Sequence, residues 1–172
     1  QKVVISALPK ILSKIPNVYY YCIGIPKEKK DCMDLARKLG VSKNIIFLGQ
    51  LENNEITYWL NCSDIFLMTS THTDKGDFEG FGISVIEAAL CGKASIVSKG
   101  ENGLCEAIEN NITGISIEEK NTEQLANHVI ELFNDEAKLK KLSANAYKRA
   151  SEHFTWEKIV EAIEENITLH CN

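Results

Sequence analysis

Two glutamates eight positions apart lie in a nearly apolar stretch of the chain, DFEGFGISVIEAALCGKASIV, residues 77–97. Glu79 precedes the sequence Gly80-Phe81-Gly82, whose two glycines allow the backbone to approach a ligand closely or to adopt a positive φ. A helix is predicted to begin directly afterwards, and the free N–H groups and positive dipole end of a helix start favour an anion. Glu87 follows about one turn into that helix. The stretch therefore combines two carboxylates, which can bind hydroxyl groups, with a place for an anion.

A molecule with hydroxyl groups at both ends and a diphosphate between them fits this pattern. At a rise of ~1.5 Å per residue, the two carboxylates are expected to lie on the order of 10 Å apart. In a nucleotide-sugar, the ribose would bind Glu87, the transferred sugar would bind Glu79, and the diphosphate would accept from the N–H groups of Gly82 and Ile83. The alternative is a glycine-rich turn in which Glu79 is only an acid near a helix start, because glycine motifs alone are weak signals.

The helix predicted over about residues 83–91 is expected to be packed nearly all round. At 100° per residue no wide polar face remains, and one side carries Ile83, Ile86 and Leu90. Glu87 falls at the margin of this apolar arc, where an unpaired buried charge costs several kcal/mol. Either a protein donor or the hydroxyls of a ligand would have to reach it, and the chain offers only two arginines, Arg37 and Arg149. A salt-bridged or solvent-exposed glutamate is the alternative.

Composition limits the remaining possibilities. The 172 residues suit one domain, and a net charge of −5 with a pI near 5.4 gives no broad basic face for nucleic acid or an anionic membrane. The six cysteines form no C-x-x-C pair, so neither a zinc site nor a redox dithiol is indicated. No run of ~18 apolar residues and no signal peptide is found, so a cytoplasmic location is expected. The chain begins directly in an amphipathic helix and looks like part of something longer.

Strand and helix patterns alternate along the chain. Strands are predicted at residues 18–24, 44–49, 64–70, 94–98 and 113–117, and helices at about 1–12, 28–39, 53–61, 83–91, 104–110, 122–134, 136–152 and 156–169. Strands that alternate with helices need crossover connections, which predicts an α/β fold with a doubly wound parallel sheet. Ligands bind such sheets beyond the carboxyl ends of the strands, where the longest predicted connection runs from Thr69 to Gly82.

The segment EGFGISVIEA, followed by ALCGKASIVS, resembles the Glu-x7-Glu signature of retaining glycosyltransferases of family 4. The resemblance extends over nearly the whole chain, through NIIFLGQL, NITGISIEEKNTEQLANHVIELFND and AYKRASEHFTWEKI. It implies a single nucleotide-sugar-binding domain over residues 1–172, the Rossmann-like C-terminal half of a GT-B fold. The terminal helices, at about 136–169, would pack on this domain. The first strand of the domain and the N-terminal acceptor domain would be absent from this fragment.

The resemblance also implies roles for particular residues. Glu79 would contact the donor sugar near its reacting carbon and is the candidate catalytic residue, while Glu87 would bind the ribose. Gln50 and Leu51 would lie against the base. The backbone that holds the sugar and diphosphate would belong to Gly80, Phe81, Gly82 and Ile83. An Arg and a Lys that usually bind the diphosphate would precede Gln1, so the fragment alone is expected to bind its donor weakly.

The chemistry implied by this family is sugar transfer with retention of configuration, in which the leaving diphosphate assists the incoming hydroxyl. No metal and no cofactor are expected, and the nucleotide-sugar is a substrate. The acceptor, a glycan or lipid-linked molecule, would bind through the missing N-terminal domain, and the full-length protein could be peripheral at a membrane. Polysaccharide biosynthesis is the expected setting, and no nucleic acid partner is expected.

Two other classes of function stay open. A nucleotide-sugar epimerase or a phosphorylase of the same fold would need additional acid-base residues or a lysine that holds pyridoxal phosphate, and neither set is recognised in the sequence. A non-catalytic nucleotide-sugar-binding module would keep the same pocket without transfer. The sequence does not separate this last class from an enzyme.

Overall fold

The computed structural model describes residues 1–25, 28–70, 81–99 and 104–170. Its strands are β1 (Tyr20–Ile23), β2 (Ile45–Gly49), β3 (Ile65–Met68), β4 (Ala94–Ser98) and β5 (Gly114–Ile117). Its helices are α1 (Lys2–Lys14), α2 (Lys29–Lys38), α3 (Asn53–Cys62), α4 (Ile83–Leu90), α5 (Leu104–Ala107), α6 (Thr122–Asn134), α7 (Glu136–His153) and α8 (Trp156–His170). A short 3-10 helix, η1 (Ser42–Asn44), was not predicted from the sequence. The α/β class predicted from the sequence is confirmed.

The strands form two parallel sheets rather than the one sheet that the sequence predicted. β1 pairs with β2, and β3, β4 and β5 pair in that order. Each neighbouring pair is joined by a helical crossover, as parallel strands require. Among the described strands none lies between β1 and β3, and this accounts for the division into two sheets.

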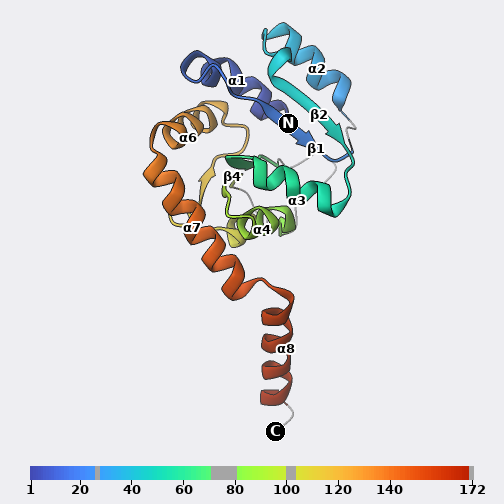
Figure 1. The fold of residues 1–172 in the computed structure, drawn as a ribbon, viewed down its shortest axis with the longest axis vertical. Helices are drawn as coiled ribbons and strands as arrows, with labels where there is room; N and C mark the ends of the chain where they lie inside the picture. The colour runs from blue at the N-terminus through green and yellow to red at the C-terminus, as the bar shows by residue number, and fades with distance from the viewer. Residues whose placement is uncertain (26–27, 71–80, 100–103, 171–172) are drawn as a thin grey trace.

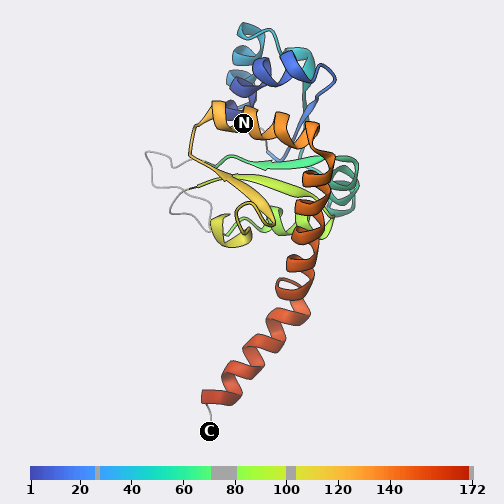
Figure 2. The same cartoon turned by 90° about the vertical axis from the view of Figure 1, so that its left-hand side faces the viewer.

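Strand β4 is buried along its whole length because helices cover both faces of its sheet. Ala94 and Ile96 pack with α1, β5 and α6 in one hydrophobic cluster. Val97 points to the other face, where it packs with α4, α5 and α7. Figure 2 shows this sheet between α6 on one side and α4 with α5 on the other. The alternation of side chains along β4 therefore divides the core into two layers.

Helix α1 joins the two sheets. Its residues Val4, Ala7 and Ile11 belong to the cluster that contains β4, β5 and α6. Its residues Ile5 and Leu8 pack instead with β1, α2 and β2. The apolar residues that recur along α1 at 3.6-residue spacing thus pack into two neighbouring cores. α1 lies across the division between the sheets (Figure 1).

Cys22, Cys32, Cys62 and Cys91 are free thiols with different surroundings. Cys22 on β1 and Cys32 on α2 are buried in the cluster that includes α1, whereas Cys62 at the end of α3 is exposed. Burial raises the pKa of the Cys22 thiol to about 11 and also raises the pKa of Cys32. A thiol that stays protonated is a poor nucleophile, so Cys22 and Cys32 serve packing.

The two C-terminal helices behave differently from each other. α7 packs against α4, α6 and strands β4 and β5. α8 projects away from the rest of the molecule (Figures 1 and 2), and Trp156, Ile159, Ile163 and Ile167 on it are exposed. The sequence predicted that the region of about 136–169 packs on the domain, which describes α7 but not α8.

Gly114, at the start of β5, is predicted to resist substitution for steric reasons. A Cβ atom added there would lie 2.8 Å from the carbonyl oxygen of Ser95 and 3.1 Å from Ile108 Cγ2. The carbonyl belongs to the backbone of β4 and cannot move away, so Gly114→Ala should lower the free energy of unfolding by about 1–3 kcal/mol. Urea unfolding would measure this, with Ser116→Ala on the same strand as the control. Equal stabilities of the two variants would contradict the packing described here.

Candidate functional site

The carboxyl ends of the strands meet at one edge of the molecule. β1 ends next to Gly24, whose N–H donates to the carbonyl of Gly49 at 2.8 Å. The ends of β3 and β4 are linked through a side chain, because the buried hydroxyl of Ser98 donates to the carbonyl of Ser70. These contacts hold neighbouring strand ends in register, and they make this edge the place where side chains from several loops can converge.

Gly82 forms the turn that starts α4. It is the N-cap residue with φ 76° and ψ 55°, a left-handed conformation that favours glycine. The N–H of Val85 donates to its carbonyl at 2.8 Å. A Cβ atom at this position would lie 2.3 Å from Leu104 Cδ2. The positive φ that the sequence allowed for a glycine is confirmed at Gly82. The close approach to a ligand stays a prediction, and the near neighbour found here is Leu104 of α5.

Phe81 is fixed by packing. Its ring lies 5.5 Å from the ring of Phe154, centroid to centroid, and it joins the cluster formed by α4, α5 and α7. The side chain is therefore turned toward the protein interior. Phe81 can face a ligand only with its backbone, which is the role that the sequence assigned to it.

The orientation of α4 differs from the one predicted. The sequence placed Ile83, Ile86 and Leu90 on the packed side, but Ile83 is 69% exposed and Leu90 is 38% exposed. The buried side is instead formed by Val85, Ile86, Ala88 and Ala89. The helix turns its small residues inward because β4 and α7 approach it closely, and small side chains permit that approach. An exposed face of Ile83, Glu87 and Leu90 results.

Glu87 is consequently exposed, and the prediction of a costly, half-buried carboxylate is wrong. Among the described residues no hydrogen bond or ion pair engages its side chain, and the two arginines pair elsewhere. Arg37 contacts Asp34 on α2, and Arg149 contacts Glu109 at 2.9 Å. Glu87 therefore stays available to a ligand. The reason to expect binding there is its position, not its burial.

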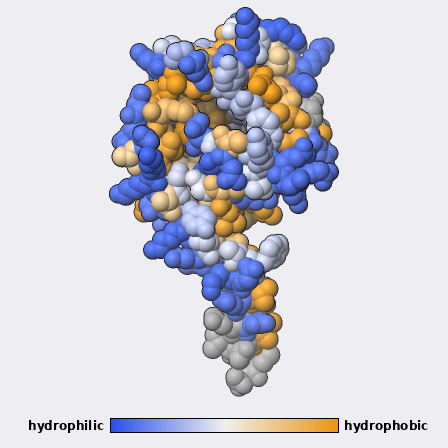
Figure 3. Space-filling view, in the orientation of Figure 1, coloured by the Kyte–Doolittle hydropathy of each residue, from blue (hydrophilic) through white to orange (hydrophobic). Residues whose placement is uncertain are grey.

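Glu87 lies at the mouth of a large cavity. The cavity has a volume of about 810 Å³ and separates β1 from β3. At the carboxyl ends of these strands it is lined by Gly24, Ser70, Ser84 and Glu87. Figure 3 shows the molecule hollowed in its upper part, with both hydrophobic and hydrophilic residues around the opening. The polar rim of the cavity thus coincides with the edge where ligands bind this class of sheet.

The remaining predicted residues are only partly placed. Gln50 is exposed and Leu51 is half-buried, and both directly follow β2 at the same edge. They do not line the cavity that Ser84 and Glu87 share. Glu79 and Gly80 lie outside the described residues, so the separation of the two glutamates is untested. The structure thus brings Glu87 together with the start of α4 but does not join Gln50 and Leu51 to them.

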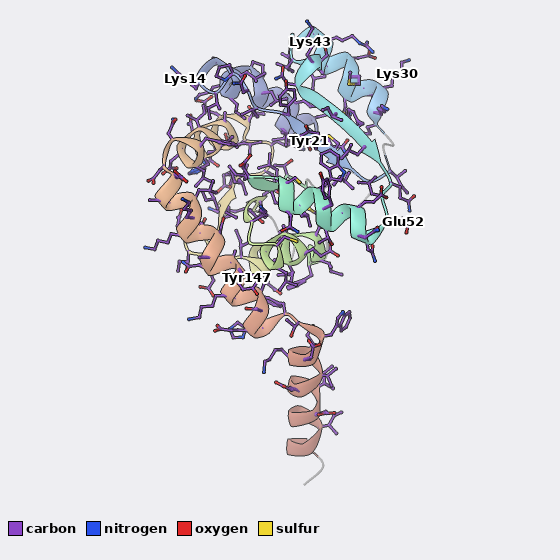
Figure 4. The ribbon with its side chains drawn as sticks, viewed as in Figure 1. Lys14, Tyr21, Lys30, Lys43, Glu52 and Tyr147 are labelled. Atoms are coloured by element: carbon purple, nitrogen blue, oxygen red, sulfur yellow. The ribbon has the colours of Figure 1, made fainter. Side chains whose placement is uncertain are left out.

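Several residues at the cavity were missed by the sequence analysis. Ser84 lies one turn before Glu87 on α4, a spacing that could have indicated a shared face. Trp59 on α3 packs against Tyr21, with ring centroids 4.9 Å apart, and lines the cavity. Figure 4 shows Tyr21 near α3 and Glu52 where that helix begins. No signal in the sequence connected Trp59 with the strand ends.

Two further findings apply to the described residues alone. Among them no group of three His, Cys, Asp or Glu side chains is placed to hold a metal ion. None of their helices has the length and apolar character needed to cross a membrane.

Family comparison identifies the class to which this fold and edge belong. The family described as glycosyl transferases group 1 matches residues 1–149, so the chain belongs to this family. A GDP-mannose-dependent monoacylated alpha-(1-6)-phosphatidylinositol monomannoside mannosyltransferase of Corynebacterium glutamicum is 28% identical over 91% of the chain and 40% of its own length. A glycogen synthase of Mycobacterium tuberculosis is 28% identical over 92% of the chain and 36% of its own length.

Solved structures support the same conclusion. Anabaena HepE in complex with UDP and glucose superposes with a TM-score of 0.84 at 26% identity, over 98% of this chain and 44% of HepE. The C-terminal domain of LpcC, a glycosyl transferase group 1 family protein from Francisella tularensis, gives 0.77 at 27% identity, over 90% of this chain and 79% of that domain. The fold is that of a Rossmann-like C-terminal half. The chain spans less than half the length of the curated relatives named above.

Gly82→Ala tests the turn at the start of α4. The substitution adds a left-handed strain of about 1–2 kcal/mol and a clash with Leu104, so the free energy of unfolding should fall by about 2–4 kcal/mol in total. Gly92→Ala is the matched control, because Gly92 has φ 69° but no atom within 4 Å of its added Cβ. Urea unfolding of both variants, and of Gly82→Ala combined with Leu104→Ala, would measure the clash. A loss no greater than that of Gly92→Ala would refute the close contact.

Proposed function

We propose that this chain is the donor-binding half of a family 4 glycosyltransferase, which transfers a sugar from a nucleotide-activated donor with retention of configuration. The observation that carries the proposal is the position of Glu87. Its carboxylate is exposed one turn into α4, on the rim where the carboxyl ends of β1 and β3 meet a cavity. Membership of the glycosyl transferases group 1 family supports the same assignment.

The proposed contacts lie at the amino end of α4 and one turn further along it. The exposed carboxylate of Glu87 accepts hydrogen bonds from the ribose hydroxyls of the donor. The diphosphate binds at the amino end of the helix, to backbone N–H groups from Gly80 through Ile83, where the helix dipole favours negative charge. Glu79 contacts the hydroxyls of the transferred sugar near the reacting carbon. Gln50 and Leu51 lie toward the base.

The proposed catalysis is mainly electrostatic. As the bond between the sugar and the diphosphate breaks, negative charge grows on the leaving phosphate, and donors that are already in place stabilise it more in the transition state than in the ground state. The turn at Gly82 fixes such donors, because Leu104 of α5 packs closely against it. The proposed reaction needs neither a metal ion nor a cofactor. The acceptor would reach this edge from a separate domain.

The relatives suggest which donors to test. HepE binds UDP and UDP-glucose in its solved complexes, and two of the related enzymes are named for GDP-mannose. We therefore propose a nucleotide-activated hexose as donor and a glycan or lipid-linked acceptor in the cytoplasm. A nucleotide-sugar epimerase, a phosphorylase or a non-catalytic binding module would use the same fold, and the experiment below separates them from a transferase.

The substitution Glu87→Ala in the full-length protein should weaken binding of a plain nucleoside diphosphate. Loss of hydrogen bonds to a charged group costs about 1.5–3 kcal/mol, so the Kd should rise roughly 10- to 100-fold. Glu79→Ala should leave that Kd nearly unchanged but reduce turnover of the nucleotide-sugar. Isothermal titration with UDP and GDP, and transfer assays with UDP-glucose and GDP-mannose, would measure both effects.

Glu136→Ala provides the control for these variants. Glu136 is an exposed acid on α7 that pairs with Lys140 at 2.6 Å, and surface pairs of this kind contribute little to stability. Its variant should bind and turn over donor like the wild type. Equal, negligible effects of the Glu79, Glu87 and Glu136 substitutions would reject the proposed function. Binding without transfer or hydrolysis in the full-length protein would instead favour the binding module.

A further inference from the structure

Arg149 on α7 is a charged side chain that is mostly enclosed, with 23% of it exposed. Each of its three nitrogens donates to a different acceptor: Nε to Glu109 at 2.9 Å, Nη2 to the carbonyl of Glu106 at 3.2 Å and Nη1 to the carbonyl of Ala107 at 3.5 Å. The guanidinium carbon also lies 4.8 Å from the centroid of the Phe154 ring. These contacts fix the guanidinium in one place, because a charge removed from water is costly unless its donors have partners.

The two carbonyls that Arg149 binds belong to the end of α5. The last C=O groups of a helix have no acceptor role within the helix and need donors from elsewhere. A guanidinium presents its donors in a rigid planar fork, so it can bind both carbonyls and the carboxylate of Glu109 together. Arg149 therefore fastens the end of α5 to α7.

α5 is in close contact with the first turn of α4. Leu104, the first residue of α5, is fully buried, and a Cβ atom added at Gly82 would lie 2.3 Å from its Cδ2. The carbonyl of Gly82 accepts from the N–H of Val85, which closes the turn. Close-packed interiors transmit displacements, so a shift of α5 would move this turn. One path of contacts thus leads from Arg149 through α5 to Gly82.

A second path leads from Arg149 through an aromatic pair. The ring of Phe154 lies between the guanidinium and the ring of Phe81, with 5.5 Å between the two ring centroids. Phe154 is held in place at the end of α7, where its N–H donates to the carbonyl of Ala150 at 2.9 Å. Phe81 directly precedes Gly82 in the chain. Both paths therefore reach the same short piece of backbone.

Arg149 also lies directly behind the first turn of α4. Together with Phe154 it lines a hollow of about 10 Å³, whose other side is formed in part by Val85 and Ile86. A hollow of this size holds about one water molecule. The guanidinium and the ring therefore support the turn from within the protein, whereas the carboxylate of Glu87 is exposed on the outer side of α4.

We infer that Arg149 is a positioning residue for the backbone at the start of α4, and that it sets the affinity of this backbone for the diphosphate of a nucleotide. Its charge is used within the protein, so it acts through the turn and not by contact with the ligand. The inference rests on the proposed function for the ligand that the turn binds. The control of the turn by Arg149 does not depend on that function.

Asn145, one turn earlier on α7, offers a comparison for a purely structural contact. Its Nδ2 donates to the carbonyl of Ile112 at 3.0 Å, so it fastens the connection between α5 and β5 to the same helix. This bond is made beyond the end of α5. Asn145→Ala should therefore lower the stability of the protein and leave the first turn of α4 as it is.

Arg149→Lys in the full-length protein separates positioning from charge. Lysine keeps a positive charge near Glu109, but its single ammonium group cannot bind two carbonyls as a planar fork and stack on Phe154. The amide of Val85, which is bonded to Gly82, should exchange about tenfold faster, while the amides of β4 keep their protection. Hydrogen exchange resolved by residue would measure both, and the β4 amides report whether the variant is folded.

Binding of a nucleoside and of its diphosphate gives the second readout. Uridine and guanosine lack the group that the turn binds, so Arg149→Lys should leave their Kd within about twofold of the wild type. The Kd for UDP or GDP should rise about tenfold, because the backbone donors of the turn are displaced. Arg37→Lys makes the same substitution at an exposed arginine of α2 and, with Asn145→Ala, should leave both values unchanged.

These readouts distinguish failure of the inference from failure of the proposed function. If the wild type binds neither UDP nor GDP, the proposed function fails, and the exchange of Val85 alone decides whether Arg149 positions the turn. Exchange and binding of Arg149→Lys equal to those of the wild type would overturn the inference. Equal weakening of nucleoside and diphosphate, or loss of β4 protection together with that of Val85, would show a purely structural role and overturn it too.

Discussion

A central strand of a parallel sheet is paired along both edges and covered on both faces, and this arrangement organises much of the molecule. β4 shows it completely, since β3 and β5 flank it and apolar helices lie above and below. Because the strands run in one direction, every connection must return along the outside as a helix or an extended segment. The carboxyl ends then converge at a single edge. The position of Glu87 at that edge is a consequence of the sheet, not an independent feature.

The same arrangement explains why the division between the sheets and the candidate site share one cavity. Strand order in a doubly wound sheet reverses at one point, and the loops on either side of that point diverge to leave a crevice. Here the two sheets divide between β1 and β3, where α1 covers one face and α3 the other.

Much of this architecture could be predicted from local patterns. β-branched and aromatic runs located every strand, and the glycine at position 82 was expected where the chain turns into α4. The orientation of α4 was predicted wrongly. Large apolar residues and alanines both occur around this helix, so a helical wheel does not show which of the two sides is buried. Only the close approach of β4 and α7 decides it, by selecting Ala88 and Ala89 for the interior. The roles of Ser84 and Trp59 depended on the same long-range packing and left no local sign.

Helix α8 affects how the protein behaves outside its site. A helix of 15 residues reaches about 22 Å, and this one carries its isoleucines into solvent without a covering element among the described residues. Exposed apolar stripes of this kind promote self-association at high concentration. Light scattering and elution volume of the 172-residue chain will therefore report on α8 more than on the sheet, and detergent or a shortened C-terminus will change them without touching Glu87.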